Sequence, residues 1–105
     1  MFVRLGSFEI KAGVLDALRS TYNTECVPLV RAARGNIDSF LLEPIAAGGA
    51  IIACTMWETE DDAARYESSG TAQEVVAKVR EYFAGPPQLG SYRVQRPAAD
   101  PRATP

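Results

Sequence analysis

The sequence predicts an α+β protein of the ferredoxin-like type, with strands and helices in the order βαββαβ. Four segments rich in Phe, Val, Ile and Leu are predicted as strands: residues 2–10, 36–44, 50–57 and 89–95. After the first and third of these, apolar residues recur every three or four positions, which indicates amphipathic helices. This order is typical of a split βαβ arrangement, a four-stranded antiparallel sheet with helices on one face.

The first half of the chain contains the first strand and a helix with a proline in it. After the strand at residues 2–10, Gly13 ends a turn and the apolar period changes to that of a helix. The stripe of that helix consists of Leu15, Leu18, Tyr22 and Cys26. Pro28 lacks an N–H and clashes with the preceding turn, so we expect it to kink or interrupt the helix. Gly35 is placed to end the helical region as a C-cap.

The second and third strands are joined by a small, flexible connection at residues 46–49, which is typical of an antiparallel hairpin. Thr59, followed three residues later by Asp62, predicts the N-cap of a helix that reaches about Glu67. Thr71 with Glu74 repeats this pattern and predicts the N-cap of the last helix.

The last strand, residues 89–95, is followed by a segment rich in Pro and Ala that offers no core residue. We therefore expect one domain over residues 1–96 and a flexible C-terminal tail over residues 97–105.

The predicted strands are apolar on both faces. In the third strand, one alternating set is Ile52, Cys54 and Met56, and the other is Ile51, Ala53, Thr55 and Trp57. A sheet with one solvated face should alternate apolar and polar residues, and the predicted helices can cover one face only. We therefore expect a second copy of the chain to cover the other face in a homodimer.

Composition excludes several classes of protein. The chain has 105 residues, a net charge of −2 and scattered basic residues, so we expect no nucleic-acid partner. It has neither an apolar run of about twenty residues nor a visible secretory signal, so we expect no membrane association and a cytoplasmic location. The absence of histidine removes imidazole-ligated metal or haem and histidine-dependent nucleophilic catalysis, and we expect no metal site. Cys26 and Cys54 are interpreted as small buried core residues.

One segment carries a family resemblance. Residues 57–63, Trp-Glu-Thr-Glu-Asp-Asp-Ala, combine the single tryptophan at the end of the third strand with an acidic helix start. With the βαββαβ order, and continuing through Tyr66 and Glu67, this pattern resembles the antibiotic biosynthesis monooxygenase family of dimeric α+β barrels. The resemblance covers all but the tail. It implies a homodimer whose two sheets form a barrel, with a ligand pocket between the sheet and the helices of each subunit.

The family resemblance also implies chemistry. Some members oxidise aromatic polyketides or quinols with molecular oxygen and no cofactor, whereas others degrade haem. The haem-degrading branch needs an axial histidine, which this chain lacks, so we expect no cofactor. The tryptophan of the cofactor-free oxygenases corresponds to Trp57. Their asparagine, four residues earlier on the same strand face, falls on Ala53, and their tyrosine falls near Ala63, about one turn before Tyr66.

The candidate catalytic residues are therefore Trp57 and Tyr66. An aromatic plane can hold a flat substrate, and a phenol can orient or protonate a substrate oxygen. The candidate substrate-binding residues are Tyr22, Tyr92, Arg93 and Asn36. Arg4 is a further strand residue that could hold a phenolate or carboxylate. Each has a structural alternative, since Trp57 and the tyrosines also fit a core and strand arginines are often solvated.

The expected function is a cofactor-independent monooxygenase that acts on a small aromatic or polyketide-like ligand in a pocket between sheet and helices. Two alternatives remain open. The first is a non-catalytic dimeric small-molecule-binding or accessory module, which Ala53 favours because alanine cannot hydrogen-bond a substrate. The second is an isomerase or cyclase built on the same barrel.

Overall fold

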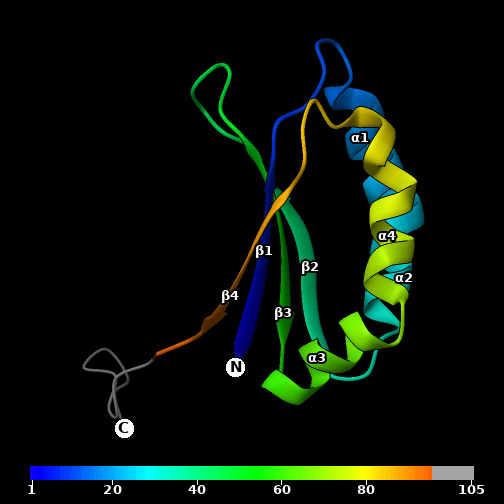
Figure 1. The fold of residues 1–105 in the computed structure, drawn as a ribbon, viewed down its shortest axis with the longest axis vertical. Helices are drawn as coiled ribbons and strands as arrows, with labels where there is room; N and C mark the ends of the chain where they lie inside the picture. Colours follow the sequence, from blue (N-terminus) through cyan, green and yellow to red (C-terminus); the bar gives the residue numbers. More distant parts are fainter. Residues whose placement is uncertain (96–105) are drawn as a thin grey trace, which may run out of the picture.

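A computed structural model describes residues 1–95, which form an antiparallel sheet with all helices on one side of it (Figure 1). The strands are β1 (Phe2–Phe8), β2 (Asn36–Leu42), β3 (Ile51–Trp57) and β4 (Gln88–Arg93). Their order across the sheet is β2-β3-β1-β4. The predicted α+β, ferredoxin-like fold is confirmed. The predicted tail at residues 97–105 and the end of the predicted domain at residue 96 lie outside the described residues.

Helical segments connect the strands on the covered face. They are α1 (Leu15–Thr21), a π-helical turn (Tyr22–Cys26), α2 (Val27–Arg31), α3 (Glu60–Ser68), α4 (Thr71–Val79) and a 3-10 turn (Arg80–Tyr82). No helix in the described part of the chain is both long and apolar enough to cross a lipid bilayer.

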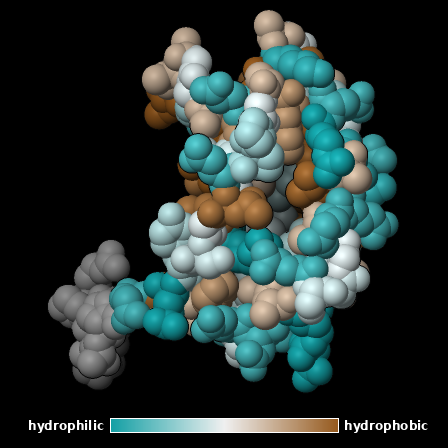
Figure 2. Space-filling view, viewed as in Figure 1, coloured by the Kyte–Doolittle hydropathy of each residue, from teal (hydrophilic) through white to brown (hydrophobic). Residues whose placement is uncertain are grey.

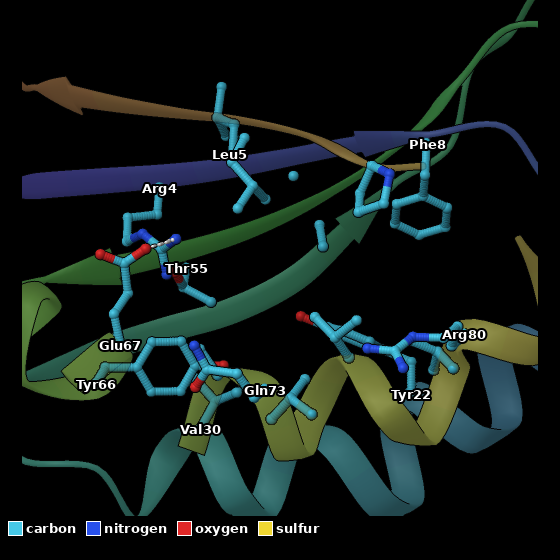
Figure 3. Close-up of a pocket in the computed structure, with 18 of the residues that line it drawn as sticks. Arg4, Leu5, Phe8, Tyr22, Val30, Thr55, Tyr66, Glu67, Gln73 and Arg80 are labelled. Atoms are coloured by element: carbon cyan, nitrogen blue, oxygen red, sulfur yellow. Dashed lines mark hydrogen bonds and ion pairs between the residues drawn. The ribbon is translucent and has the colours of Figure 1, made fainter. Parts of the chain in front are cut away.

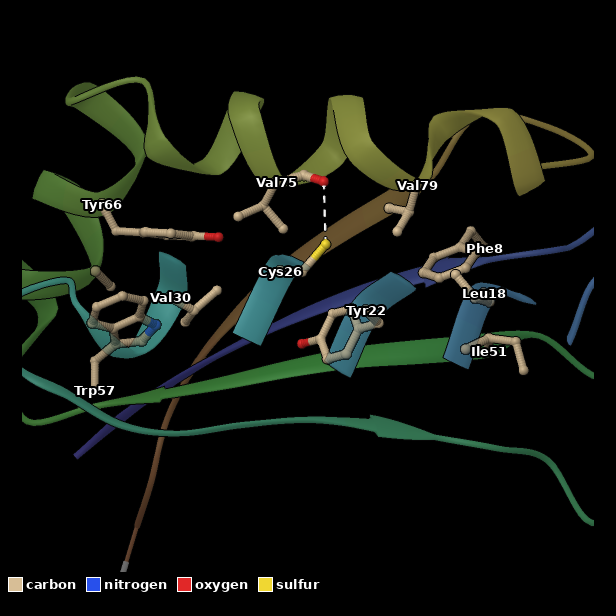
Figure 4. Close-up of a cluster of buried hydrophobic side chains, with 11 residues drawn as sticks. Phe8, Leu18, Tyr22, Cys26, Val30, Ile51, Trp57, Tyr66, Val75 and Val79 are labelled. Carbon is tan, nitrogen blue, oxygen red and sulfur yellow. Dashed lines mark hydrogen bonds between the residues drawn. The ribbon is translucent and has the colours of Figure 1, made fainter. Parts of the chain in front are cut away.

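Pro28 does not end the first helical region. The π-helical turn lies directly before α2, and the N–H of Val27 donates to the carbonyl of Tyr22, five residues earlier. This wider turn accommodates the proline ring, so the helix changes its hydrogen-bonding pattern and continues. The buried residues on this helical region are Leu18, Tyr22, Cys26 and Val30, which lie in one row along the core (Figure 4).

One of the three predicted helix caps is confirmed. The Thr59 hydroxyl accepts a hydrogen bond from the backbone N–H of Asp62 at 3.1 Å, so Thr59 is the N-cap of α3. The predicted C-cap at Gly35 is wrong, because α2 ends at Arg31 with Ala32 as its C-cap. The prediction that Thr71 caps α4 is also wrong. Gly70 is the N-cap there, with φ of +89°, and Thr71 is the first helical residue. The connection from α3 to α4 is so short that a residue in the left-handed region is needed, and glycine adopts that region without strain.

Strand register assigns the side chains to the two faces of the sheet. Arg4 lies opposite Thr55 and Gly6 lies opposite Ala53, on the face covered by the helices. The other face carries Val3, Phe40, Leu42, Ile52, Cys54, Met56 and Tyr92. No helix of residues 1–95 covers this second face, and Leu42 and Tyr92 are 44% and 55% exposed there. The predicted apolar character of both faces is therefore observed.

Gly35, between α2 and β2, has φ of +82°, and an added Cβ would lie 2.1 Å from the Asp62 side chain. We expect Gly35→Ala to lower the free energy of unfolding by more than the roughly 1–2 kcal/mol that left-handed strain alone costs. Gly13→Ala is the matched control, because Gly13 has φ of +77° and open space around its Cβ position. Denaturant unfolding measures both losses. Equal losses would contradict the close approach of Asp62.

Candidate active site

A cavity of about 270 Å³ lies between the sheet and the helices (Figure 3). Residues of β1, β3, β4, α3 and α4 line it, together with Tyr22 and Val30. Most of the wall is apolar, and its larger apolar side chains are Phe8, Val30, Val75, Val76, Val79 and Phe83. Figure 2 shows apolar surface around a hollow in this face of the molecule.

The cavity exists because small residues meet at its centre. Gly6 and Ala53 are register partners on β1 and β3, and Ala72 of α4 also contributes to the wall. A close-packed core would fill this space with larger side chains. Ala53 stands where the family resemblance places an asparagine, so that position faces the cavity but supplies no polar group.

Polar side chains gather at one end of the cavity. Arg4 of β1 and Thr55 of β3 lie side by side in the register, and Tyr66 and Glu67 of α3 face them (Figure 3). The Arg4 guanidinium forms an ion pair with Glu67, and its central carbon lies 5.9 Å from the centroid of the Tyr66 ring. The Arg4 side chain is only 11% exposed, so the cation belongs to the cavity rather than to the surface.

Trp57 lies behind this polar end and does not line the cavity. It is fully buried, and its indole N–H donates to the hydroxyl of Thr55 at 2.9 Å. Its ring packs against Tyr66, with a distance of 4.8 Å between centroids and an angle of 36° between planes (Figure 4). Trp57 therefore fixes the positions of two residues that line the cavity.

The two cavity tyrosines are neutral at physiological pH. Burial raises the pKa of Tyr22 to about 12. The hydrogen bond of 2.8 Å between the hydroxyls of Tyr22 and Ser39 lowers this pKa, but by less than burial raises it. Burial also raises the pKa of Tyr66 well above its ordinary value. Both phenols are therefore hydrogen-bond donors rather than bases near pH 7. The Tyr66 hydroxyl has no hydrogen-bond partner among residues 1–95.

Burial has the same effect on the cysteines: it raises the pKa of Cys26 to about 11 and also raises that of Cys54. Neither thiol is a nucleophile near neutral pH. No cluster of three side chains suited to holding a metal ion occurs within residues 1–95.

Three of the predicted substrate-binding residues lie outside the cavity. The Asn36 amide donates to the carbonyls of Asp38 and Met56, both at 3.1 Å. Tyr92 is on the uncovered face of the sheet. The Arg93 side chain is 68% exposed and lies 3.6 Å from a Glu60 carboxylate oxygen. As substrate-binding residues, these three would have to act from outside the cavity.

Of the six predicted site residues, only Tyr22 and Tyr66 line the cavity. Thr55 and Glu67 line the cavity but were not predicted as site residues. A signal for Thr55 was available, because it shares the strand face of Trp57 and Ala53 and is the polar residue between them. Glu67 gave no such signal, since its position depends on how α3 packs against β1.

Residues 1–78 match the model of the antibiotic biosynthesis monooxygenase family. The chain belongs to this family. No curated protein matches it at a significant level.

Solved structures agree with the family assignment. A candidate antibiotic biosynthesis monooxygenase from Bordetella bronchiseptica is 26% identical, with 90% of this chain and 97% of that chain covered and a TM-score of 0.74. SnoaB, a cofactor-independent oxygenase from Streptomyces nogalater, is 11% identical, with 94% and 97% covered and a TM-score of 0.75. The monooxygenase ActVA-Orf6 from Streptomyces coelicolor, solved with nanaomycin D, is 14% identical, with 94% and 91% covered and a TM-score of 0.75. At these identities, the two Streptomyces proteins establish a shared fold.

The hydrogen bond between Trp57 and Thr55 leads to a prediction about stability. We expect Trp57→Phe and Thr55→Val each to lower the free energy of unfolding by about 1–3 kcal/mol. Together they should cost about 1 kcal/mol less than the sum, because both remove the same bond. Denaturant unfolding of the single and double variants measures this coupling.

The matched control combines Trp57→Phe with Thr21→Val, because the Thr21 hydroxyl bonds Tyr82 at 2.9 Å, away from Trp57. That pair should be additive. Additivity of the Thr55 pair as well would contradict a structural role for the indole N–H.

Proposed function

We propose that this member of the antibiotic biosynthesis monooxygenase family is a homodimeric, cofactor-independent monooxygenase. Its substrate is a small aromatic or polyketide-like molecule bound between sheet and helices. The observation that carries this proposal is the cavity itself, which has apolar walls and, at one end, the neutral phenol of Tyr66 beside the Thr55 hydroxyl. Sites for small organic ligands are concave and mostly apolar, with a few fixed polar groups. That SnoaB and ActVA-Orf6 are described as oxygenases supports the same reaction class here.

The reaction that fits this site takes its electrons from the substrate. An activated CH2 group between aromatic rings reacts with O2 to give a carbonyl group and water. One oxygen atom enters the carbonyl and the other leaves as water, and four electrons pass from the substrate carbon to oxygen. The chain then has to bind an ionised, electron-rich substrate, hold its oxygen atoms and keep water away. Tyr66 donates to a substrate oxygen, the apolar wall excludes water, and Trp57 holds Tyr66 in place.

The proposed dimer rests on the second face of the sheet. Phe40, Ile52 and Met56 are half-buried there, and Leu42 and Tyr92 are exposed, yet no element of residues 1–95 covers them. An apolar sheet face of this size is a common feature of obligate dimer interfaces. Two such faces packed together would enclose the sheets and leave the helices and both cavities outside.

A non-catalytic binding module is the second candidate, and Ala53 favours it. Ala53 lies on the cavity wall and its side chain cannot form a hydrogen bond. The family resemblance implies that the cofactor-free oxygenases have an asparagine at this position. In this alternative the cavity binds the same aromatic class without reacting it with oxygen.

The dimer is tested by placing a charge on the uncovered face. We expect the wild-type protein to sediment at twice the 11.4 kDa chain mass at micromolar concentration. Tyr92→Glu should shift it towards the monomer, because a buried, unpaired carboxylate opposes association. Leu89→Glu is the matched control, since Leu89 is also exposed on β4, at 66%, but faces the other side of the sheet. A wild-type monomer that is folded and soluble would contradict the dimer.

The enzymatic proposal is tested by oxygen uptake with anthrones and hydroquinones. We expect uptake by the wild type, and Tyr66→Phe should lower kcat by roughly a hundredfold, the scale of a lost proton donor. Tyr82→Phe is the control, because Tyr82 bonds Thr21 and does not line the cavity.

Trp57 fluorescence reports ligand binding under either candidate function, because Trp57 contacts two residues of the wall, and oxygen uptake separates the two functions. A fluorescence response without oxygen uptake would favour the binding module, and Ala53→Asn should then confer uptake if only the polar group is missing. Neither a fluorescence response nor uptake with any of these compounds would refute the aromatic pocket.

A further inference from the structure

The polar end of the cavity contains one buried hydrogen-bond donor without an acceptor, Nε of Arg4. The Thr55 hydroxyl accepts from Trp57, which leaves its own proton free to point elsewhere. The Tyr66 hydroxyl has no protein hydrogen-bond partner within residues 1–95 but is accessible from the cavity, whereas Nε of Arg4 is buried without an acceptor. Buried donors are nearly always paired in proteins, so the Nε–H of Arg4 lacks an acceptor oxygen in the empty cavity.

Glu67 engages only one of the two donors on one edge of the Arg4 guanidinium. A single Glu67 oxygen accepts from Nη2 of Arg4, while Nε, on the same edge of the guanidinium, remains without a partner. A carboxylate can engage both donors of such an edge in bidentate fashion. The Glu67 side chain is 48% exposed and the Arg4 side chain is 11% exposed, so the carboxylate contacts water far more than the guanidinium does. Nε is therefore the donor of Arg4 that the empty cavity leaves without an acceptor.

We propose that Arg4, with the hydroxyls of Thr55 and Tyr66, binds the negatively charged oxygen of an aromatic acid, and that Glu67 occupies the Arg4 edge only while the cavity is empty. The ligand class is a flat apolar ring system with one carboxylate or phenolate at its end. This inference rests on the proposed function in one respect, that the cavity accepts aromatic molecules.

The shape of the cavity fixes the orientation of such a ligand. Its charged oxygen lies at the end formed by β1 and α3, and its ring extends towards the apolar end near Phe8 and Val79. Nε of Arg4 is shielded in the empty cavity, so the ligand oxygen reaches it as the Glu67 carboxylate moves further into water. Arg80 also lines the cavity but lies well away from Arg4, beyond Tyr22 in the view of Figure 3. Arg80 therefore offers a comparison cation in the same cavity.

The test uses two probes of nearly equal shape, 2-naphthoate and 2-naphthamide, with binding measured by calorimetry and by Trp57 fluorescence. The wild type should bind the acid at least tenfold more tightly than the amide. Arg4→Gln should abolish this preference and leave affinity for the amide within a few-fold. Glu67→Gln should increase affinity for the acid several-fold, because it removes the competing carboxylate. Arg80→Gln, the matched control, should keep the preference.

The outcomes separate this inference from the proposed function. If wild type binds acid and amide equally, or Arg4→Gln retains the preference, the aromatic cavity stands and the role of Arg4 is refuted. If the preference disappears in Arg80→Gln and not in Arg4→Gln, the charged oxygen lies at the other end and the inference is refuted. If neither probe binds to wild type, the aromatic cavity and this inference both fail. Oxygen uptake enters none of these comparisons. If Arg4→Gln does not fold, Glu67→Gln still tests the inference: a several-fold increase in affinity for the acid supports it, and no increase overturns it.

A second measurement excludes a purely structural role for Arg4. The anion of 4-nitrophenol absorbs visible light, so its ionisation can be followed while it is bound. A tenfold preference for the anion lowers the pKa of the bound nitrophenol by about one. We expect that decrease with wild type and with Arg80→Gln, and its loss with Arg4→Gln. An unchanged nitrophenol pKa on binding to wild type would overturn the inference.

Discussion

The indole N–H of Trp57 is a donor with no access to water, and the need to satisfy it constrains the surrounding structure. Leaving such a donor unpaired costs about 1–3 kcal/mol, a large part of the stability of a small domain. Thr55 satisfies it from two residues away on the same strand face. Because Thr55 lies opposite Arg4 and Trp57 packs against Tyr66, one hydrogen bond links the positions of β1, β3 and α3. The arrangement of the polar end of the cavity thus follows from the hydrogen bond that pairs the buried indole N–H with Thr55.

The empty volume has a different origin. Gly6 and Ala53 are neighbours across two strands, and the larger core residues Phe8 and Trp57 lie on either side of them on the same sheet face. The wall of the cavity is mostly apolar, and Arg4 at its polar end is placed by its contacts with Glu67 and Tyr66. Under the proposed function, a ligand bound in the cavity would meet a preformed set of donors.

Sequence patterns predicted the strands, the buried helical stripe and the Thr59 cap, because each depends on neighbours within a few residues. Predictions that depended on distant partners were less successful. Tyr92 could be placed on a strand, but only its register with Val3 assigns it to the uncovered face. Asn36 lies at a register irregularity next to Asp38, which local alternation does not reveal. Similarly, Trp57 was identified as important from the family pattern, yet whether it contacts the cavity depended on the packing of α3.

The π-helical turn before Pro28 has a geometric consequence for the core. Leu18, Tyr22, Cys26 and Val30 are spaced four residues apart, and on a regular helix of 3.6 residues per turn each step of four rotates the side chain by about 40°. Over the three steps from Leu18 to Val30, the side chains would therefore rotate away from the sheet by about 120°. A turn closed by a hydrogen bond over five residues unwinds the helix and opposes this drift, so all four side chains remain buried against the core. The number of residues in the wide turn therefore sets the rotation of α2 relative to α1 about the helix axis. Loss of a single residue there would rotate Val30 relative to Leu18 by about 100° and separate the two halves of the stripe.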